Sequence, residues 1–130
     1  MGASAGLMEP PRVLVIDDDE AILRLLRLSM ASDGLLVATA RDGTAGLERL
    51  DSDEFDVIVL DLQMPGMDGR TFYREMVSRG YEAPVVILSA YGAEKAKREL
   101  GAAAAVAKPF DPDMLIETVR GLVNYKETRN

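Results

Sequence analysis

The sequence predicts a doubly wound α/β domain, in which a parallel sheet of five strands is covered by helices on both faces. Five short apolar segments alternate along the chain with longer segments whose apolar residues recur at helical spacing. The short segments are apolar at nearly every position, as is typical of parallel strands buried on both faces. This regular alternation favours an α/β sandwich. The length of 130 residues fits a single domain of this kind.

Runs of valine, isoleucine, leucine and alanine predict the five strands, at residues 13–16, 35–40, 57–60, 85–88 and 103–107. The fifth run is the weakest, because it consists mostly of alanine. Amphipathic spacing predicts helices at residues 21–32, 42–50, 71–78 and 93–100, and a last helix from Asp111 or Asp113 to about Tyr125.

Capping and loop residues separate these elements. Asp19 and Asp42 each stand where a side chain can accept hydrogen bonds from the first turn of a helix. Residues 65–69 have loop chemistry, with one proline and two glycines, and Asp68 is expected to cap the third helix. Gly80 is a plausible stop for that helix.

The composition excludes several classes of function. The chain has no cysteine and no histidine, so thiolate chemistry and the commonest general base and zinc ligand are excluded. A net charge of −7 is a poor match for nucleic acid, and no apolar run approaches the ~20 residues that cross a bilayer. We therefore expect a cytoplasmic protein whose domain binds neither nucleic acid nor a membrane, with a flexible N-terminal tail over residues 1–11.

Polar side chains follow four of the predicted strands, each at the point where the strand ends. Asp17 and Asp18 follow the first strand, Asp61 the third, Ser89 the fourth and Lys108 the fifth. The carboxyl ends of parallel strands meet at one edge of the sheet, where sites in such folds form. The sequence therefore predicts that three carboxylates, a hydroxyl and an ammonium group converge there.

This set of groups suits phosphoryl chemistry beside a divalent metal ion. Three neighbouring carboxylates repel one another, and Mg²⁺ relieves that repulsion while leaving positions for phosphate oxygens. A carboxylate can also attack phosphorus to form an aspartyl phosphate. A lysine and a hydroxyl would then neutralise and hydrogen-bond the phosphoryl oxygens.

Four segments give the chain a resemblance to the receiver domain of two-component response regulators: residues 13–19, 57–69, 85–90 and 107–110. They occur in that family's order and spacing. The resemblance implies a flavodoxin-like sheet with strand order 2-1-3-4-5, a receiver domain over residues 12–126, and a C-terminal tail over residues 127–130.

The resemblance also implies a role for each matching residue. Asp61 matches the aspartate that is phosphorylated to 4-aspartylphosphate, and Ser89 and Lys108 match the groups that contact the phosphoryl oxygens. Asp17, Asp18, Asp61 and the backbone carbonyl of Gln63 match the ligands of Mg²⁺, with Asp18 favoured over Asp17 as a direct ligand. The bond between Lys108 and Pro109 is expected to be cis.

In that family, a sensor histidine kinase or a histidine phosphotransfer protein supplies the phosphoryl group. The implied function is a signalling switch in a phosphorelay, assisting only its own phosphorylation and dephosphorylation, and acting on a downstream protein or on an output domain outside this sequence. Two alternatives stay open at this point. One is a magnesium phosphatase of the haloacid-dehalogenase type, although residues 17–21 lack that family's threonine; the other is a binding module that is never phosphorylated.

Two features depart from the family or stand outside the site. Ala105 occupies the position where the family often has an aromatic residue that couples phosphorylation to the output face, and Tyr91 is a candidate substitute. The cluster of cations at residues 95–98 is usually a solvated helix face, with partner binding as the alternative. Met64, Met67 and Met114 are expected to be packing residues.

Overall fold

The computed structural model describes residues 9–129, and most of the predicted N-terminal tail lies outside them. Five parallel strands form one sheet in the order β2-β1-β3-β4-β5, which confirms the predicted fold class and strand order. The strands are β1 (Arg12–Ile16), β2 (Leu36–Ala40), β3 (Val57–Asp61), β4 (Val85–Ser89) and β5 (Ala104–Ala107). β3 lies at the centre, so Asp61 stands in the middle of the sheet's carboxyl edge.

Five helices connect or follow these strands: α2 (Glu20–Ser32), α3 (Gly43–Ser52), α4 (Gly69–Ser78), α5 (Ala93–Leu100) and α6 (Pro112–Arg129). Most boundaries fall within two residues of the prediction. The last helix runs beyond the expected end near Tyr125 and includes residues 127–129, so the predicted C-terminal tail over these residues is wrong. No glycine or proline follows Gly121, so nothing in the sequence terminates this helix earlier.

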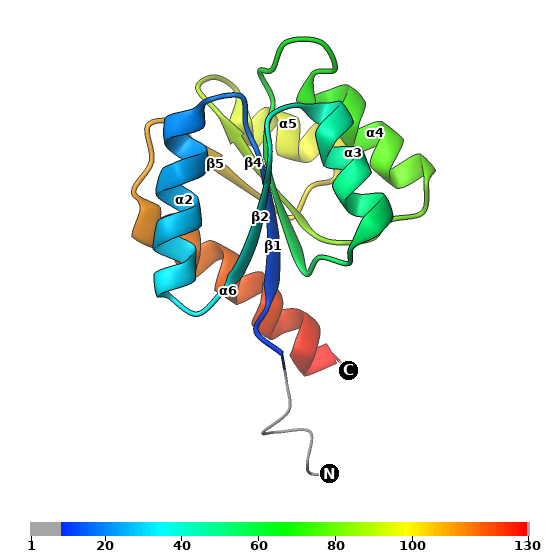
Figure 1. Ribbon diagram of the computed structural model, residues 1–130. Helices are drawn as coiled ribbons and strands as arrows, with labels where there is room; N and C mark the ends of the chain where they lie inside the picture. The colour runs from blue at the N-terminus through cyan, green and yellow to red at the C-terminus, as the bar shows by residue number, and fades with distance from the viewer. Residues whose placement is uncertain (1–8, 130) are drawn as a thin grey trace.

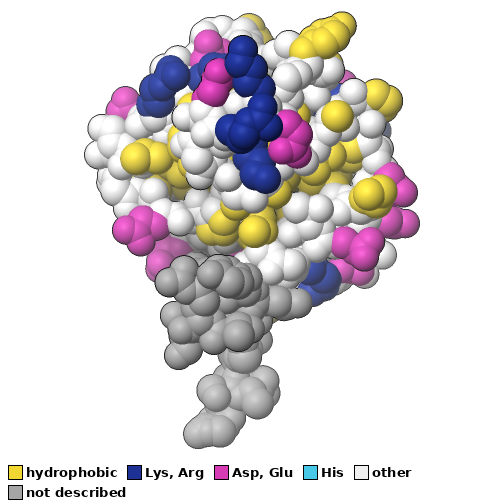
Figure 2. All heavy atoms as spheres, turned by 180° about the vertical axis from the view of Figure 1, so that it is seen from behind, with side chains coloured by type: hydrophobic (Ala, Val, Ile, Leu, Met, Phe, Trp, Pro, Cys, Tyr) yellow, Lys and Arg dark blue, Asp and Glu magenta, His cyan; other side chains and the backbone are white. Residues whose placement is uncertain are grey.

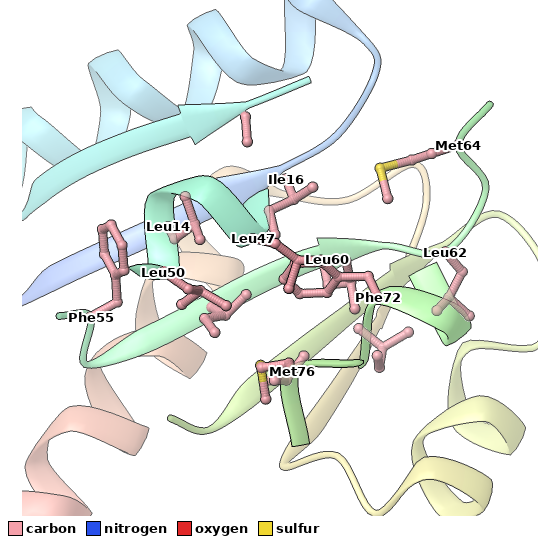
Figure 3. Close-up of a cluster of buried hydrophobic side chains, with 14 of the residues drawn as sticks. Leu14, Ile16, Leu47, Leu50, Phe55, Leu60, Leu62, Met64, Phe72 and Met76 are labelled. Carbon is pink, nitrogen blue, oxygen red and sulfur yellow. The ribbon is translucent and has the colours of Figure 1, made fainter. Parts of the chain in front are cut away.

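The helices form two layers around the sheet, with α2 and α6 on one face and α3, α4 and α5 on the other (Figure 1). Alternate residues of each strand point to opposite layers, so Leu14 and Ile16 join one cluster while Val13 and Val15 join the other. Figure 3 shows the first cluster, in which Phe72 of α4 is fully buried beside the strands. Burying each large apolar side chain contributes about 2 kcal/mol, so both layers hold the sheet in place.

The predicted caps fix where three helices begin. Asp19 accepts hydrogen bonds from the first turn of α2, Asp42 from Ala45 and Asp68 from Thr71. Each such cap is typically worth about 1 kcal/mol. Within residues 9–129, none of the helices has the length and apolar character required to cross a membrane.

A glycine allows α4 to start directly against the end of β3. A Cβ atom on Gly69 would lie 2.5 Å from the backbone oxygen of Asp61 and 2.6 Å from Leu62 Cα, which is closer than real Cβ contacts. The Gly69 N–H instead donates a hydrogen bond to the Leu62 carbonyl, at 3.0 Å. This close approach holds the loop that follows Asp61 in a fixed path.

Candidate functional site

The carboxyl edge of the sheet brings the predicted site residues together. Asp61 is the last residue of β3 and Ser89 the last of β4, while Asp17 directly follows β1 and Lys108 directly follows β5. Asp17, Asp61 and Ser89 are the only buried polar or charged residues in the described part of the chain. A site of polar groups has therefore been built into an otherwise apolar core.

Lys108 reaches across the edge of the sheet to two carboxylates. Its Nζ atom lies 2.9 Å from Asp17 Oδ2 and 3.3 Å from Asp61 Oδ1. The Lys108 N–H donates to the Ser89 carbonyl at 2.9 Å, and the following bond to Pro109 is cis, as expected. Burial alone would lower the pKa of Lys108, but its pairing with Asp17 and the charge of Asp61 outweigh burial and raise that pKa. The ammonium group therefore stays charged.

Burial and repulsion act on Asp61. Burial raises the pKa of its carboxyl group and the neighbouring charge of Asp17 raises it further, so that the net pKa, with all its neighbours acting, is about 6. The Gln63 N–H, which donates to Asp61 Oδ1 at 3.2 Å, and the ammonium of Lys108 act in the opposite direction. The single charge of Lys108 therefore does not compensate for burial and for the repulsion between the carboxylates, and the pKa of Asp61 stays raised.

The acidic pair has one buried and one open member. Asp17 is fully buried, and its Oδ1 accepts a hydrogen bond from the Asp19 N–H at 2.9 Å. Its Oδ2 accepts no hydrogen bond from the described residues, although Lys108 lies close enough to offset part of its charge. Asp18 is exposed. The sequence predicted the pair but gave no indication of this difference in burial.

These residues fit a divalent cation. One carboxylate oxygen from each of Asp17, Asp18 and Asp61 lies within 4.8 Å of the others. Asp17 Oδ2 is buried and has the Lys108 ammonium as its close contact, and one ammonium leaves the three carboxylates with an excess of negative charge that a hard cation with oxygen ligands would relieve. The Gln63 carbonyl stays a predicted ligand, since the described contacts of Gln63 involve its N–H.

Ser89 has a partner that the sequence did not reveal. Its Oγ donates a hydrogen bond to the Tyr91 carbonyl at 2.6 Å and accepts one from the Tyr91 N–H at 3.2 Å. The side chain of Tyr91 is 80% exposed, whereas Ala105 is half-buried against the core. α5 begins after Gly92, so Ser89 does not cap it.

The fold and this site define a class of protein: an α/β domain whose sheet presents, at its carboxyl edge, a cluster of carboxylates that could hold a cation beside a partly buried lysine. Over residues 13–120 the chain matches the family described as the response regulator receiver domain, and it belongs to that family. It is thus a receiver domain of the response regulators of two-component systems, a family of signalling switches.

Among curated proteins, the chain is 36% identical over 117 residues to the response regulator MprA of Mycolicibacterium vanbaalenii. The aligned segment covers 88% of this chain and 51% of MprA. It is 34% identical over 114 residues to the transcriptional regulatory protein GlrR of Escherichia coli, covering 85% of this chain and 26% of GlrR. The chain thus spans about half or less of the length of these relatives.

Solved structures of receiver domains agree with the fold. The receiver domain of the Francisella response regulator 1452 superposes with a TM-score of 0.84 at 33% identity, covering 89% of this chain and 98% of that one. The response regulator TrrA of Thermotoga maritima, in complex with Mg²⁺ and BeF, gives a TM-score of 0.76 at 30% identity, covering 86% and 98%.

Proposed function

We propose that this domain accepts a phosphoryl group on Asp61 in a Mg²⁺-dependent reaction and thereby switches the surface that it offers to partners. The observation that carries the proposal is the cluster of three carboxylates at the carboxyl edge of the sheet, two of which are paired with one lysine. Packing alone does not require this excess of charge, whereas phosphoryl transfer has a use for each group.

The residues that would hold Mg²⁺ are Asp17, Asp18, Asp61 and the backbone carbonyl of Gln63. The bound ion supplies positive charge that neutralises the phosphoryl oxygens. The donor set of three clustered carboxylates supports this proposal, as does the similarity to TrrA, whose structure contains Mg²⁺ and BeF.

Asp61 is the nucleophile in this proposal. One of its carboxylate oxygens forms a P–O bond while the P–N bond of a phosphohistidine breaks. The electron pair of the broken bond stays on the imidazole nitrogen, which is neutralised by a proton from water. Lys108, 3.3 Å from Asp61 Oδ1, stands where its ammonium can stabilise the transferred oxygens.

Ser89 would report the phosphoryl group to the rest of the domain. To donate its hydroxyl proton to a phosphoryl oxygen, Ser89 must release the Tyr91 carbonyl that it contacts at 2.6 Å. That exchange loosens the turn leading into α5 and shifts a pre-existing equilibrium of the surface formed by α5, β5 and α6. Since Ala105 is too small to act as an aromatic reporter, the exposed ring of Tyr91 is the candidate in its place.

A phosphohistidine donor must lie outside this sequence, because these 130 residues contain no histidine. We infer a sensor histidine kinase or a histidine phosphotransfer protein in the cytoplasm. The downstream target of the signal is another protein or an output domain outside this sequence. The receiver domain itself contacts neither nucleic acid nor a membrane. It turns over no separate substrate and assists only its own phosphorylation and dephosphorylation.

The test is labelling with acetyl phosphate, followed by intact-mass measurement. The parent protein should gain one phosphoryl group only when Mg²⁺ is present, and Asp61→Asn should gain none. Asp68→Asn is the matched control, because it alters a carboxyl group in the same loop region but keeps a capping side chain. Labelling of Asp61→Asn equal to that of the parent would overturn the assignment. An absence of measurable Mg²⁺ affinity in titration would favour a binding module that is never phosphorylated.

A further inference from the structure

We propose that α4 and α5 together form a docking surface for an acidic segment of a partner protein. The surface, here called the cationic face, consists of Arg70, Arg74, Lys95, Lys97 and Arg98. Figure 2 shows Lys and Arg side chains gathered over the upper part of the rear face, where α5 lies. Such a gathering is unexpected in a chain whose net charge is −7.

Three of these cations have no ionic partner in the part of the chain that the structure describes: Arg74, Lys95 and Arg98. Arg70 is paired with Glu99 at 2.6 Å, and Lys97 lies 3.9 Å from Glu94. Elsewhere in the described part of the chain, Arg12, Arg41, Arg79 and Arg120 have carboxylate partners, whereas Arg24, Arg27 and Arg49 make no ion pair but belong to other helices. The cationic face therefore keeps positive charge that its own carboxylates do not offset.

The cations of the two helices form one patch. Arg70 of α4 reaches Glu99 of α5 and ties the two helices together. The hydrogen bond from Arg70 lowers the pKa of Glu99, and the charges of Arg70, Lys95 and Arg74 lower it further. Cations from both helices are thus close enough to act on the same carboxylate, so an acidic segment laid across α4 and α5 would meet charges from both.

The chemistry of the patch favours a protein partner over a nucleic acid or a lipid surface. Glu94 and Glu99 lie among the cations, and they would repel a continuous row of phosphates. Membrane-surface helices expose bulky apolar side chains beside their cations, but the apolar residues of α5, Ala93, Ala96 and Leu100, pack against the core. Spaced carboxylates on a protein segment can pair with individual cations and avoid both glutamates.

None of the five cations belongs to the phosphorylation site, so this inference goes beyond the proposed function. The test uses the full chain, unphosphorylated and free of metal, with a fluorescein-labelled peptide of twelve alternating glutamate and alanine residues as the probe. Binding is measured by fluorescence anisotropy and mapped by amide chemical shifts. We expect shifts over α4 and α5, and weaker binding as added salt screens exposed charges.

The matched variants carry the same change of net charge on different helices. Lys95→Glu/Arg98→Glu should bind the peptide roughly tenfold more weakly, because two exposed attractions become repulsions. Arg24→Glu/Arg27→Glu on α2 should bind it like the parent. Lys95→Gln/Arg98→Gln should show an intermediate loss, which keeps the test valid if the charge-reversal variant fails to fold.

Three results would overturn the proposal: no binding by the parent, an equal loss in both charge-reversal variants, or tighter binding of single-stranded oligo-dT with the same chemical shifts. The last result would assign the face to nucleic acid. Asp61→Asn should bind the peptide like the parent. A failure of phosphorylation and a failure of peptide docking are therefore distinguished by separate readouts.

Discussion

The two ends of the parallel sheet both gather charged side chains, but they balance those charges differently. At the amino end, Asp51 accepts a hydrogen bond from the Tyr81 hydroxyl at 2.5 Å and lies 3.2 Å from Arg79, and Arg12 lies 3.6 Å from Asp53. These charged side chains are between 38% and 55% exposed, and each meets an opposite charge or a hydrogen-bond donor. The amino end is a balanced, solvated set of contacts.

The carboxyl end is buried and unbalanced. Asp17 and Asp61 are 0% and 1% exposed and share one lysine, and a carboxylate oxygen of Asp18 lies within 4.8 Å of theirs. Exposed pairs contribute little to stability, whereas buried charges without full compensation are costly. The difference teaches that charge density alone does not mark a functional site; charge that is both buried and in excess does.

The largest expected effect comes from removing the lysine at the carboxyl end. Lys108→Met should lower the free energy of unfolding by about 4 kcal/mol at pH 8 without metal, because it leaves buried carboxylates unpaired. Mg²⁺ should restore part of the loss. Arg79→Ala at the amino end should cost no more than about 1 kcal/mol. Urea denaturation measures both, and equal losses would contradict the contrast between the two ends.

Replacing the Asp61 carboxylate should raise the free energy of unfolding, whereas replacing Lys108 should lower it. Burial and Asp17 raise the pKa of Asp61 from 3.8 to about 6, so the folded protein binds this proton more tightly than the unfolded chain does. Asp61 therefore costs no stability below its unfolded pKa, and the cost develops as the pH rises through about 6. Above pH ~7 and without metal, Asp61→Asn should be more stable than the parent by about 2–3 kcal/mol.

Asp51→Asn provides the comparison for that variant at the amino end. It should lose up to about 1 kcal/mol, because an exposed pair and a hydrogen bond are weakened. The loss should show no step near pH 6. If Asp61→Asn proves less stable than the parent at pH 8, the buried charge at the carboxyl end does not destabilise the fold.

A smaller effect concerns the linkage between protons and Mg²⁺. Asp61 must lose its proton to bind the ion, so lowering the pH below about 6 should weaken Mg²⁺ binding by up to ~10-fold per pH unit. Above that range the affinity should level off. Calorimetric titration at several pH values measures this, and an affinity that is independent of pH between 5 and 7 would contradict the assigned pKa shift.

The sequence predicted the carboxyl end better than the amino end. Asp17, Asp61, Ser89 and Lys108 could be located from the sequence because each directly follows an apolar run, and parallel strands bring their ends to one edge. The caps at Asp19, Asp42 and Asp68 could be located for a similar reason, since a cap acts on its own neighbours in sequence.

Features that depend on the packed chain could not be predicted in this way. The hydrogen bond from Tyr81 to Asp51 joins residues 30 positions apart, and no periodicity encodes it. The burial of Asp17 beside an exposed Asp18 depends on how β1 is covered, and the hydrogen bonds of Ser89 with Tyr91 depend on the turn that precedes α5. These details need the packed structure, and the last two determine how the phosphorylation site would work.

The smallest expected effect is at the amino end, where Tyr81→Phe removes only the hydroxyl that donates to Asp51. Asp51 keeps Arg79 at 3.2 Å and its contact with water, so the loss should stay below about 1 kcal/mol. Tyr73→Phe is the matched control, since Tyr73 is half-buried on α4 and its hydroxyl makes no hydrogen bond within the described residues. Urea denaturation of both variants should give nearly parental midpoints. A loss of unfolding free energy for Tyr81→Phe as large as that for Lys108→Met would contradict this expectation. It would mean that exposed polar contacts at the amino end stabilise the fold as much as buried ones at the carboxyl end.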